Sequence, residues 1–109
     1  MRRELDFEVM EPWQRVIAEE EAQLLKKELQ GEVGEQHVLF GLPVSVLARR
    51  VDKDDVLFFL EDGSGRCAVV HLTWSHKREA TPWPRTTLYS DLQDWAAKCM
   101  EPSHREYLI

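Results

Sequence analysis

Three aromatic side chains around one polar stretch of the chain are the best candidates to contact a ligand or a partner protein. Trp74 and Trp83 bracket this stretch, two prolines flank the second tryptophan, and Tyr89 follows it closely. Tryptophan and tyrosine are enriched among the residues that dominate binding energy. Two interpretations are open: the loop forms a recognition surface, or it folds back so that Trp83 closes the core beneath it.

His71 and Arg85 add polar chemistry beside these aromatic residues in the sequence. In an extended segment His71 shares one side with Cys67, but four strand residues separate them by about 13 Å, which excludes a Cys–His nucleophilic dyad there. We therefore expect His71 to be a partly exposed, hydrogen-bonded residue of a sheet. We expect no catalytic residue, and the candidate binding residues are Trp74, Trp83, Arg85, Tyr89 and His71.

No spacing in the chain matches a metal or phosphate site. Cys67, His71 and His76 lie too far apart along a strand and its exit to resemble the paired ligands of structural zinc. Residues 62–65 (Asp-Gly-Ser-Gly) lack the Gly-Lys-Ser/Thr ending of a phosphate loop. Residues 52–55 lack the glycine and the closing glutamate of a calcium loop. We expect no metal and no cofactor.

The charge of the chain argues against nucleic acid and anionic membranes as partners. The 109 residues include 20 acids and 14 bases, a net charge of −6, whereas such partners are bound by clustered Lys and Arg. Ten acids and three bases lie between Glu4 and Glu35. We therefore expect an acidic N-terminal third, with Glu20 and Glu28 on its exposed face, and a protein partner that is basic.

The sequence also bears on the compartment. No apolar run follows Arg2 and Arg3, as a secretory signal requires, and no run of about 18 apolar residues could span a membrane. Two cysteines are too few for a disulfide scaffold. We expect a cytoplasmic protein in which Cys67 and Cys99 are reduced.

The elements that must position these side chains are helical near both ends of the chain. Pro12 suits the first turn of a helix, residues 12–30 are rich in helix formers, and Gly31 is a plausible C-terminal cap. Ser90 and Gln93 match a capping box for a second helix. The apolar seam of the first helix consists of Ala18, Ala22, Leu25 and Leu29. The second helix should bury Trp95 and end near Met100, because Pro102 disfavours helical backbone before it.

The middle of the chain reads as strands. Three apolar runs, residues 43–51, 56–60 and 67–74, are joined by short polar turns and therefore predict an antiparallel meander. His37–Phe40 could add a short edge strand, and residues 75–87 should form a loop. In the third strand we expect Ala68, Val70, Leu72 and Trp74 to face the helices, and Cys67, Val69, His71 and Thr73 to face away from them.

The sequence thus predicts one α+β domain over residues 1–109, in which residues 1–10 could be a flexible segment. It consists of an N-terminal helix, a three-stranded antiparallel meander with the optional fourth edge strand, and a C-terminal helix, all in one pair of layers.

One pattern resembles a small family of uncharacterised bacterial proteins. It comprises residues 69–74 (V-V-H-L-T-W), residues 83–89 (W-P-x-T-T-x-Y) and Asp94-Trp95, with upstream pieces at residues 37–41 and 54–58. The resemblance covers residues 36–107. It implies a bacterial origin and a single domain, and it transfers no activity and no catalytic residue.

Two classes of function remain open. The first is a non-catalytic protein-interaction module, such as an adaptor, an inhibitor or an immunity-type protein, and we favour it over an enzyme. The second is a small-molecule-binding protein or an enzyme that uses the Trp74–Trp83 loop and His71. A pocket of ordinary size is hard to fit into so small a domain, although a homodimer could create one. A concave pocket lined by His71, Arg85 and the tryptophans would favour the second class, and a flat surface the first.

Overall fold

The computed structural model describes residues 7–109, which form a five-stranded antiparallel sheet with helices on both of its faces. The strands lie side by side in chain order: β1 (Trp13–Arg15), β2 (Val44–Arg50), β3 (Asp55–Leu60), β4 (Cys67–His71) and β5 (Arg85–Tyr89). The helices are α1 (Glu19–Glu32), α2 (Leu92–Trp95), the π-helix η1 (Ala96–Met100) and α3 (Glu101–Tyr107). The α+β class is confirmed, but the sheet has two strands more than the predicted meander.

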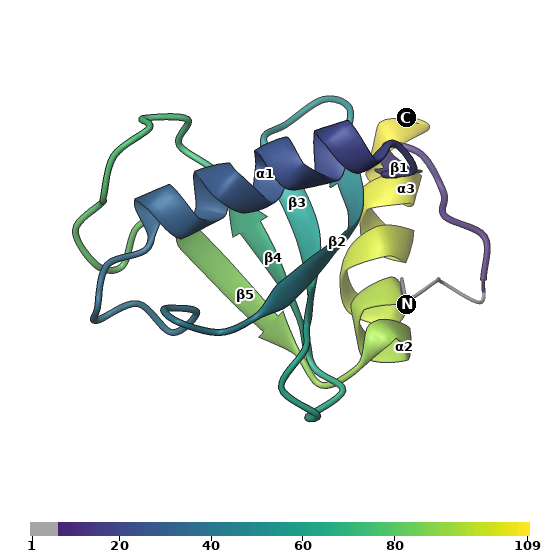
Figure 1. Cartoon of the computed structure of the whole chain (residues 1–109). Helices are drawn as coiled ribbons and strands as arrows, with labels where there is room; N and C mark the ends of the chain where they lie inside the picture. The colour runs from purple at the N-terminus through teal and green to yellow at the C-terminus, as the bar shows by residue number, and fades with distance from the viewer. Residues whose placement is uncertain (1–6) are drawn as a thin grey trace.

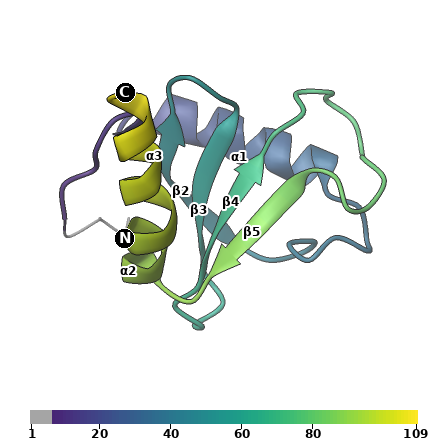
Figure 2. The same cartoon turned by 180° about the vertical axis from the view of Figure 1, so that it is seen from behind.

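The two ends of the chain pack on opposite faces of the sheet, so the expectation of one pair of layers is wrong. α1 lies across one face (Figure 1), and α2 and α3 stand on the other, beside β2 (Figure 2). Alternation along β3 divides its side chains between two cores: Phe58 packs under α1, whereas Leu57 and Phe59 pack under the C-terminal helices. Cys67, expected to face away from the helices, is buried in this second core.

The predicted first helix begins seven residues late. Residues 13–15 form β1, and Trp13 pairs with Arg50 of β2. Trp13 is buried and packs edge-on against Trp95, with ring centroids 5.3 Å apart. Pro12 suits the start of an edge strand as well as a first helical turn, and sheet pairing with a buried tryptophan decides between them. The helix also continues through Gly31 to Glu32.

The central strands are confirmed with small changes. β2 and β3 lie within a residue of the predicted bounds, and β4 ends at His71 rather than Trp74. Residues 37–40 form turns and no strand. β5 lies partly inside the predicted loop, because its polar residues 85–87 give no apolar alternation, although β4 provides their hydrogen-bond partners.

The C-terminal helix runs past the predicted stop. Its cap is Asp91, whose carboxylate accepts a hydrogen bond from Asp94 N (2.7 Å), one residue after the predicted cap. A π-helical turn follows, in which Glu101 N–H donates to Ala96 O, five residues back. Pro102 then occupies the first turn of α3, where a missing N–H is tolerated.

The predicted flexible segment 1–10 lies outside the described residues for positions 1–6. In the part that is described, Phe7 stacks on Trp95 at 6.2 Å, and Val9 and Met10 pack against the second core. Both cysteines are free thiols. Within residues 7–109, the helices are all too short or too polar to cross a bilayer.

Candidate functional site

One half of one sheet face is left without a helix, and we call it the open face. The C-terminal helices stand over the β1–β3 side of their face and leave much of β4 and β5 uncovered (Figure 2). The open face consists of His71, Arg85 and Thr87, which are exposed, and Val69 and Tyr89, which are half-buried. Three of the five candidate binding residues therefore belong to it.

His71 lies at the polar end of this face, between β3 and β5. Its Cα pairs with Asp55 on β3 and with Arg85 on β5. The His71 imidazole Nδ1 lies 2.7 Å from Asp55 Oδ1, and about half of the His71 side chain is exposed. His71 is thus the partly exposed, hydrogen-bonded sheet residue that the alternation predicts.

Trp83 and Arg85 form one exposed unit beside His71. The guanidinium carbon of Arg85 lies 4.8 Å from the centroid of the Trp83 ring, a cation–π contact. Trp83 is 40% exposed. The ring and the cation are therefore held together at the surface, where a partner could contact both.

Trp74 and Tyr89 lie away from this unit. Trp74 is half-buried against the core under α1, and its ring is edge-on to His76 with centroids 6.3 Å apart. Tyr89 lies at the far end of β5, where burial raises its pKa well above the usual value. The structure thus brings Trp83 and Arg85 together beside His71. The two tryptophans, Trp74 and Trp83, do not form one surface.

Two buried glutamates of α1 hold the start of the loop that carries Trp83, and we call them the carboxylate clamp. Glu32 is fully buried and accepts hydrogen bonds from Thr73 N (3.0 Å) and Trp74 N (2.9 Å). Glu28 accepts from His76 N (3.1 Å), and its other oxygen lies 2.7 Å from His76 Nδ1. Trp74 and His76 have φ angles of 57° and 59°, a left-handed backbone that costs about 1–2 kcal/mol per residue. The hydrogen bonds to the two carboxyl groups, about 0.5–1.5 kcal/mol to a neutral group and about 1.5–3 kcal/mol to a charged one, offset much of that cost.

The clamp holds one proton between its two carboxyl groups. Burial, with hydrogen bonding to Glu28, raises the pKa of Glu32 to about 7. Burial also acts to raise the pKa of Glu28, but hydrogen bonds from Glu32 and His76 outweigh it, and this pKa falls below its usual value. Below about pH 7, Glu32 therefore carries the proton and donates it towards an ionised Glu28.

The far end of the same loop is held by a buried histidine. His37 Nδ1 accepts a hydrogen bond from Leu39 N (3.0 Å), which leaves Nε2 as the donor to Pro84 O (2.9 Å). The Thr86 hydroxyl lies 3.2 Å from the same Nε2. His37 thereby fixes the point where β5 begins, next to Trp83 and Arg85.

The acidic N-terminal third is less exposed than expected. The prediction that Glu28 lies on an exposed acidic face is wrong, because Glu28 and Glu32 are both buried in the clamp. Glu21 is bound to Arg49 of β2 at 2.8 Å, whereas Glu20 is exposed as predicted. A signal for the clamp was present in the sequence: Glu28 and Glu32 share the helical stripe of Leu25 and Leu29, which faces the sheet.

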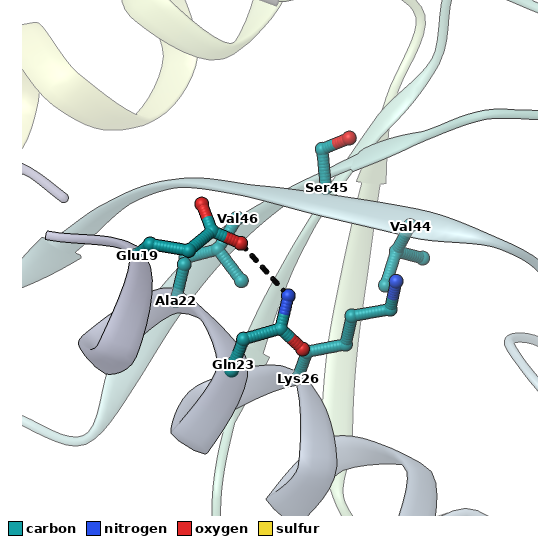
Figure 3. A pocket seen from close by; sticks show the side chains of 7 residues that line it. All are labelled: Glu19, Ala22, Gln23, Lys26, Val44, Ser45 and Val46. Atoms are coloured by element: carbon teal, nitrogen blue, oxygen red, sulfur yellow. Dashed lines mark hydrogen bonds between the residues drawn. The ribbon is translucent and has the colours of Figure 1, made fainter. Parts of the chain in front are cut away.

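Two grooves flank the open edges of the sheet. One, of about 410 Å³, lies along β5 and is lined by Gln36, His37, Val38, Thr81, Pro82, Arg85, Thr86 and Thr87. The other, of about 280 Å³, lies between α1 and β2; there Val44 and Val46 point towards the helix and Ser45 points away (Figure 3). The groove along β5 includes Arg85 but neither His71 nor a tryptophan, so it is not the pocket expected of a small-molecule site.

Among residues 7–109, no three or more His, Cys, Asp and Glu side chains are grouped to hold a metal ion. Comparisons of the chain with protein-family models, curated proteins and solved structures find no match. The resemblance of residues 36–107 to a bacterial family stays a prediction.

Proposed function

We propose that this protein is a non-catalytic interaction module that binds another protein through the open face together with the neighbouring Trp83. The exposed unit of Trp83 and Arg85, beside His71, carries this proposal. Tryptophan and arginine are the residue types most enriched at interaction hot spots. Hydrogen bonds to His37 and Glu32 fix the two ends of the loop that presents Trp83, so less conformational freedom is lost on binding.

The titratable groups inside the fold support a structural role over a catalytic one. Burial raises the pKa of the Cys67 thiol to about 12, so it is protonated and a poor nucleophile at neutral pH. The oxygens of Glu28 and Glu32 are occupied by backbone N–H groups and by each other. These groups act on the fold rather than on a substrate.

The charge of the chain favours a basic partner. A net charge of −6 attracts a cationic protein at long range and speeds their encounter. An adaptor, an inhibitor or an immunity-type protein would each use such a combination of long-range attraction and a rigid aromatic contact. The alternative, a small-molecule site built from the loop and His71, is less well supported, because the groove along β5 includes neither His71 nor a tryptophan.

Affinity capture from the source organism tests this function. The tagged chain is compared with Trp83→Ala, with Arg85→Ala and with a control, Lys27→Ala, at an exposed position of α1. We expect a protein, identified by mass spectrometry, that the wild type and the control retain and that the Trp83 and Arg85 variants lose. Retention of the same proteins by all four chains, or of none by any, contradicts the proposal.

A further inference from the structure

The hydrogen-bond phase of the sheet determines which backbone groups of β5 point outwards. Leu60 N donates to Arg66 O, and Leu72 N donates to Asp54 O, so even-numbered residues of β4 and its flanks bond to β3. In an antiparallel sheet the direction alternates along each strand. The odd-numbered residues of β4 therefore bond to β5, where their partners are Arg85, Thr87 and Tyr89. The N–H and C=O groups of Thr86 and Leu88 consequently face away from the sheet along an open edge.

These outward groups are complementary to a second copy of themselves. When two β5 strands run antiparallel about Thr87, Thr86 of each copy faces Leu88 of the other, and four hydrogen bonds can form. A register centred on Thr86 would place Leu88 opposite Pro84, which has no N–H. A register centred on Leu88 would use Ser90, whose N–H already donates to Asp94 Oδ2 (3.0 Å). Only the register about Thr87 uses all four outward groups of each strand.

The groove along β5 accepts a side chain in this same register. Leu88 is 37% exposed and lies on the α1 side of the sheet, like Thr86. Across the dimer axis it would lie beside Thr86 of the other copy, within the groove that Val38 lines. Val38 is itself 54% exposed. Each copy would thus bury one exposed leucine against one exposed valine of its partner.

On the opposite side of the sheet, the register joins the two open faces. Arg85 of one copy would face Tyr89 of the other, and directly opposed side chains on antiparallel strands lie about 4.5–5.5 Å apart at Cβ. The guanidinium that contacts Trp83 would then also meet a tyrosine ring. The only charged residue of β5 is Arg85, and the antiparallel arrangement keeps the two arginines at opposite ends of the paired strands.

The first half of β2, which β1 leaves unpaired, suits a second copy less well. β1 pairs with Ala48–Arg50, and Val16 N continues this line by donating to Leu47 O (3.1 Å). Pairing of two β2 strands about Ser45 would place Pro43 of the second copy opposite Leu47, where Val16 already lies. The groove in Figure 3 therefore stays outside this interface.

We propose that two copies of this chain pair through β5, antiparallel and centred on Thr87, to give a continuous ten-stranded sheet. Tyr89 of the second copy then completes the surface formed by Trp83 and Arg85. The pairing itself stands on the strand edge and its groove, whereas the role of Tyr89 in recognition rests on the proposed function.

Sedimentation velocity of the full chain over a concentration series measures the assembly. We expect the mass to rise from 12.8 kDa towards twice that value with concentration, because a strand pair is a small interface. Leu88→Lys places a cation in the groove and on the edge, and should raise the dimer Kd about tenfold or more. Leu24→Lys, at an exposed position of α1, is the matched control and should leave the Kd unchanged.

Disulfide trapping reports the register. About Thr87 the two strands bring their Cα atoms within about 4.5 Å, so Thr87→Cys should oxidise to a covalent dimer. The wild type supplies the background, because burial raises the pKa of both native thiols. A wild type that stays at the monomer mass at every concentration, or a dimer that Thr87→Cys does not trap, overturns the proposal.

The two proposals fail separately. If the wild type is monomeric but captures another protein in a Trp83-dependent way, only the proposed dimer is contradicted. A trapped dimer without such capture supports the pairing and contradicts the proposed function.

Discussion

The same five strands form both faces of this sheet, but the two faces are covered in different ways. The face under α1 is closed by a mostly aliphatic core, with the carboxylate clamp at one end of the helix. The other face is half aromatic core, under the C-terminal helices, and half open. Because side chains alternate along a strand, neighbouring residues serve different purposes: Val70 is fully buried under α1, and His71 is exposed on the open face. A small domain can therefore stabilise its fold and present a contact surface with the same strands.

The largest expected effect concerns the covered half of the second face. Trp95 is fully buried between Trp13 and Phe7. Trp95→Ala should lower the free energy of unfolding by about 3–5 kcal/mol, the usual cost for a buried large aromatic residue. Denaturant melts followed by circular dichroism measure the change. A loss below about 1 kcal/mol would show that the C-terminal helices add little to the second core.

The next effect tests the closed face through pH. Glu32 has a pKa of about 7 in the folded chain and an ordinary value of 4.5, so the native state binds more protons between these values. Stability should therefore fall as pH rises through this window, by on the order of 2–3 kcal/mol. The Glu32→Gln side chain cannot ionise. The free energy of unfolding of this variant, measured by urea melts between about pH 5 and pH 8, should therefore depend less on pH. Glu20→Gln, at an exposed position, should keep the slope of the wild type.

A somewhat smaller effect concerns the contact that holds the start of β5. His37 joins the turn after α1 to the start of β5 through Pro84 O and Thr86. His37→Ala leaves buried polar groups without partners and should cost about 1–3 kcal/mol. Hydrogen exchange followed by mass spectrometry should show faster exchange in residues 85–89, with β2 and β3 as the internal reference. Uniform acceleration over the whole sheet would contradict a local role.

The smallest effect concerns the open half. Trp83 is partly exposed, and its ring packs against the Arg85 guanidinium. Trp83→Ala should cost about 1 kcal/mol or less in stability, as changes outside a core usually do. The measurement is the same denaturant melt as for Trp95→Ala. A comparable loss in the two variants would make the loop part of the core and remove the contrast between the halves.

The fold could be predicted where the apolar pattern has one physical reading. The runs that became β2, β3 and β4 are long and apolar, so they appear in the expected order and pairing. β1 has three residues, too few to show a hydrophobic period. β5 begins with polar residues, which form a strand because β4 provides their hydrogen-bond partners. The layer order has a signal in the sequence: residues 56–60 are apolar without alternation, which indicates cover on both faces of the sheet.

The site could be predicted in part for a similar reason. Alternation places His71 correctly, whereas Arg85 shares its surface because β5, which the sequence did not indicate, pairs with β4. Alternation also places Trp74 on the α1 side, where it packs against the core, but the end of β4 before it could not be predicted. The left-handed backbone at Trp74 depends on a carboxylate from α1, far away in the chain. Long-range hydrogen bonds of this kind leave no local pattern in the sequence around the loop.

The π-helical turn between α2 and α3 constrains how the length of this chain can change. Such a turn is equivalent to one residue inserted into an α-helix, and each residue rotates a helix by about 100°. Deleting one residue from 96–100 would restore a regular α-helix. All later residues of the helix would then rotate by about 100° about its axis. Ser103, now buried with its hydroxyl near Arg50 and bonded to Cys99 O, would rotate out of that position. Homologues one residue shorter here must therefore present a different side chain to Arg50, and an alignment that ignores the gap would pair the wrong residues along α3.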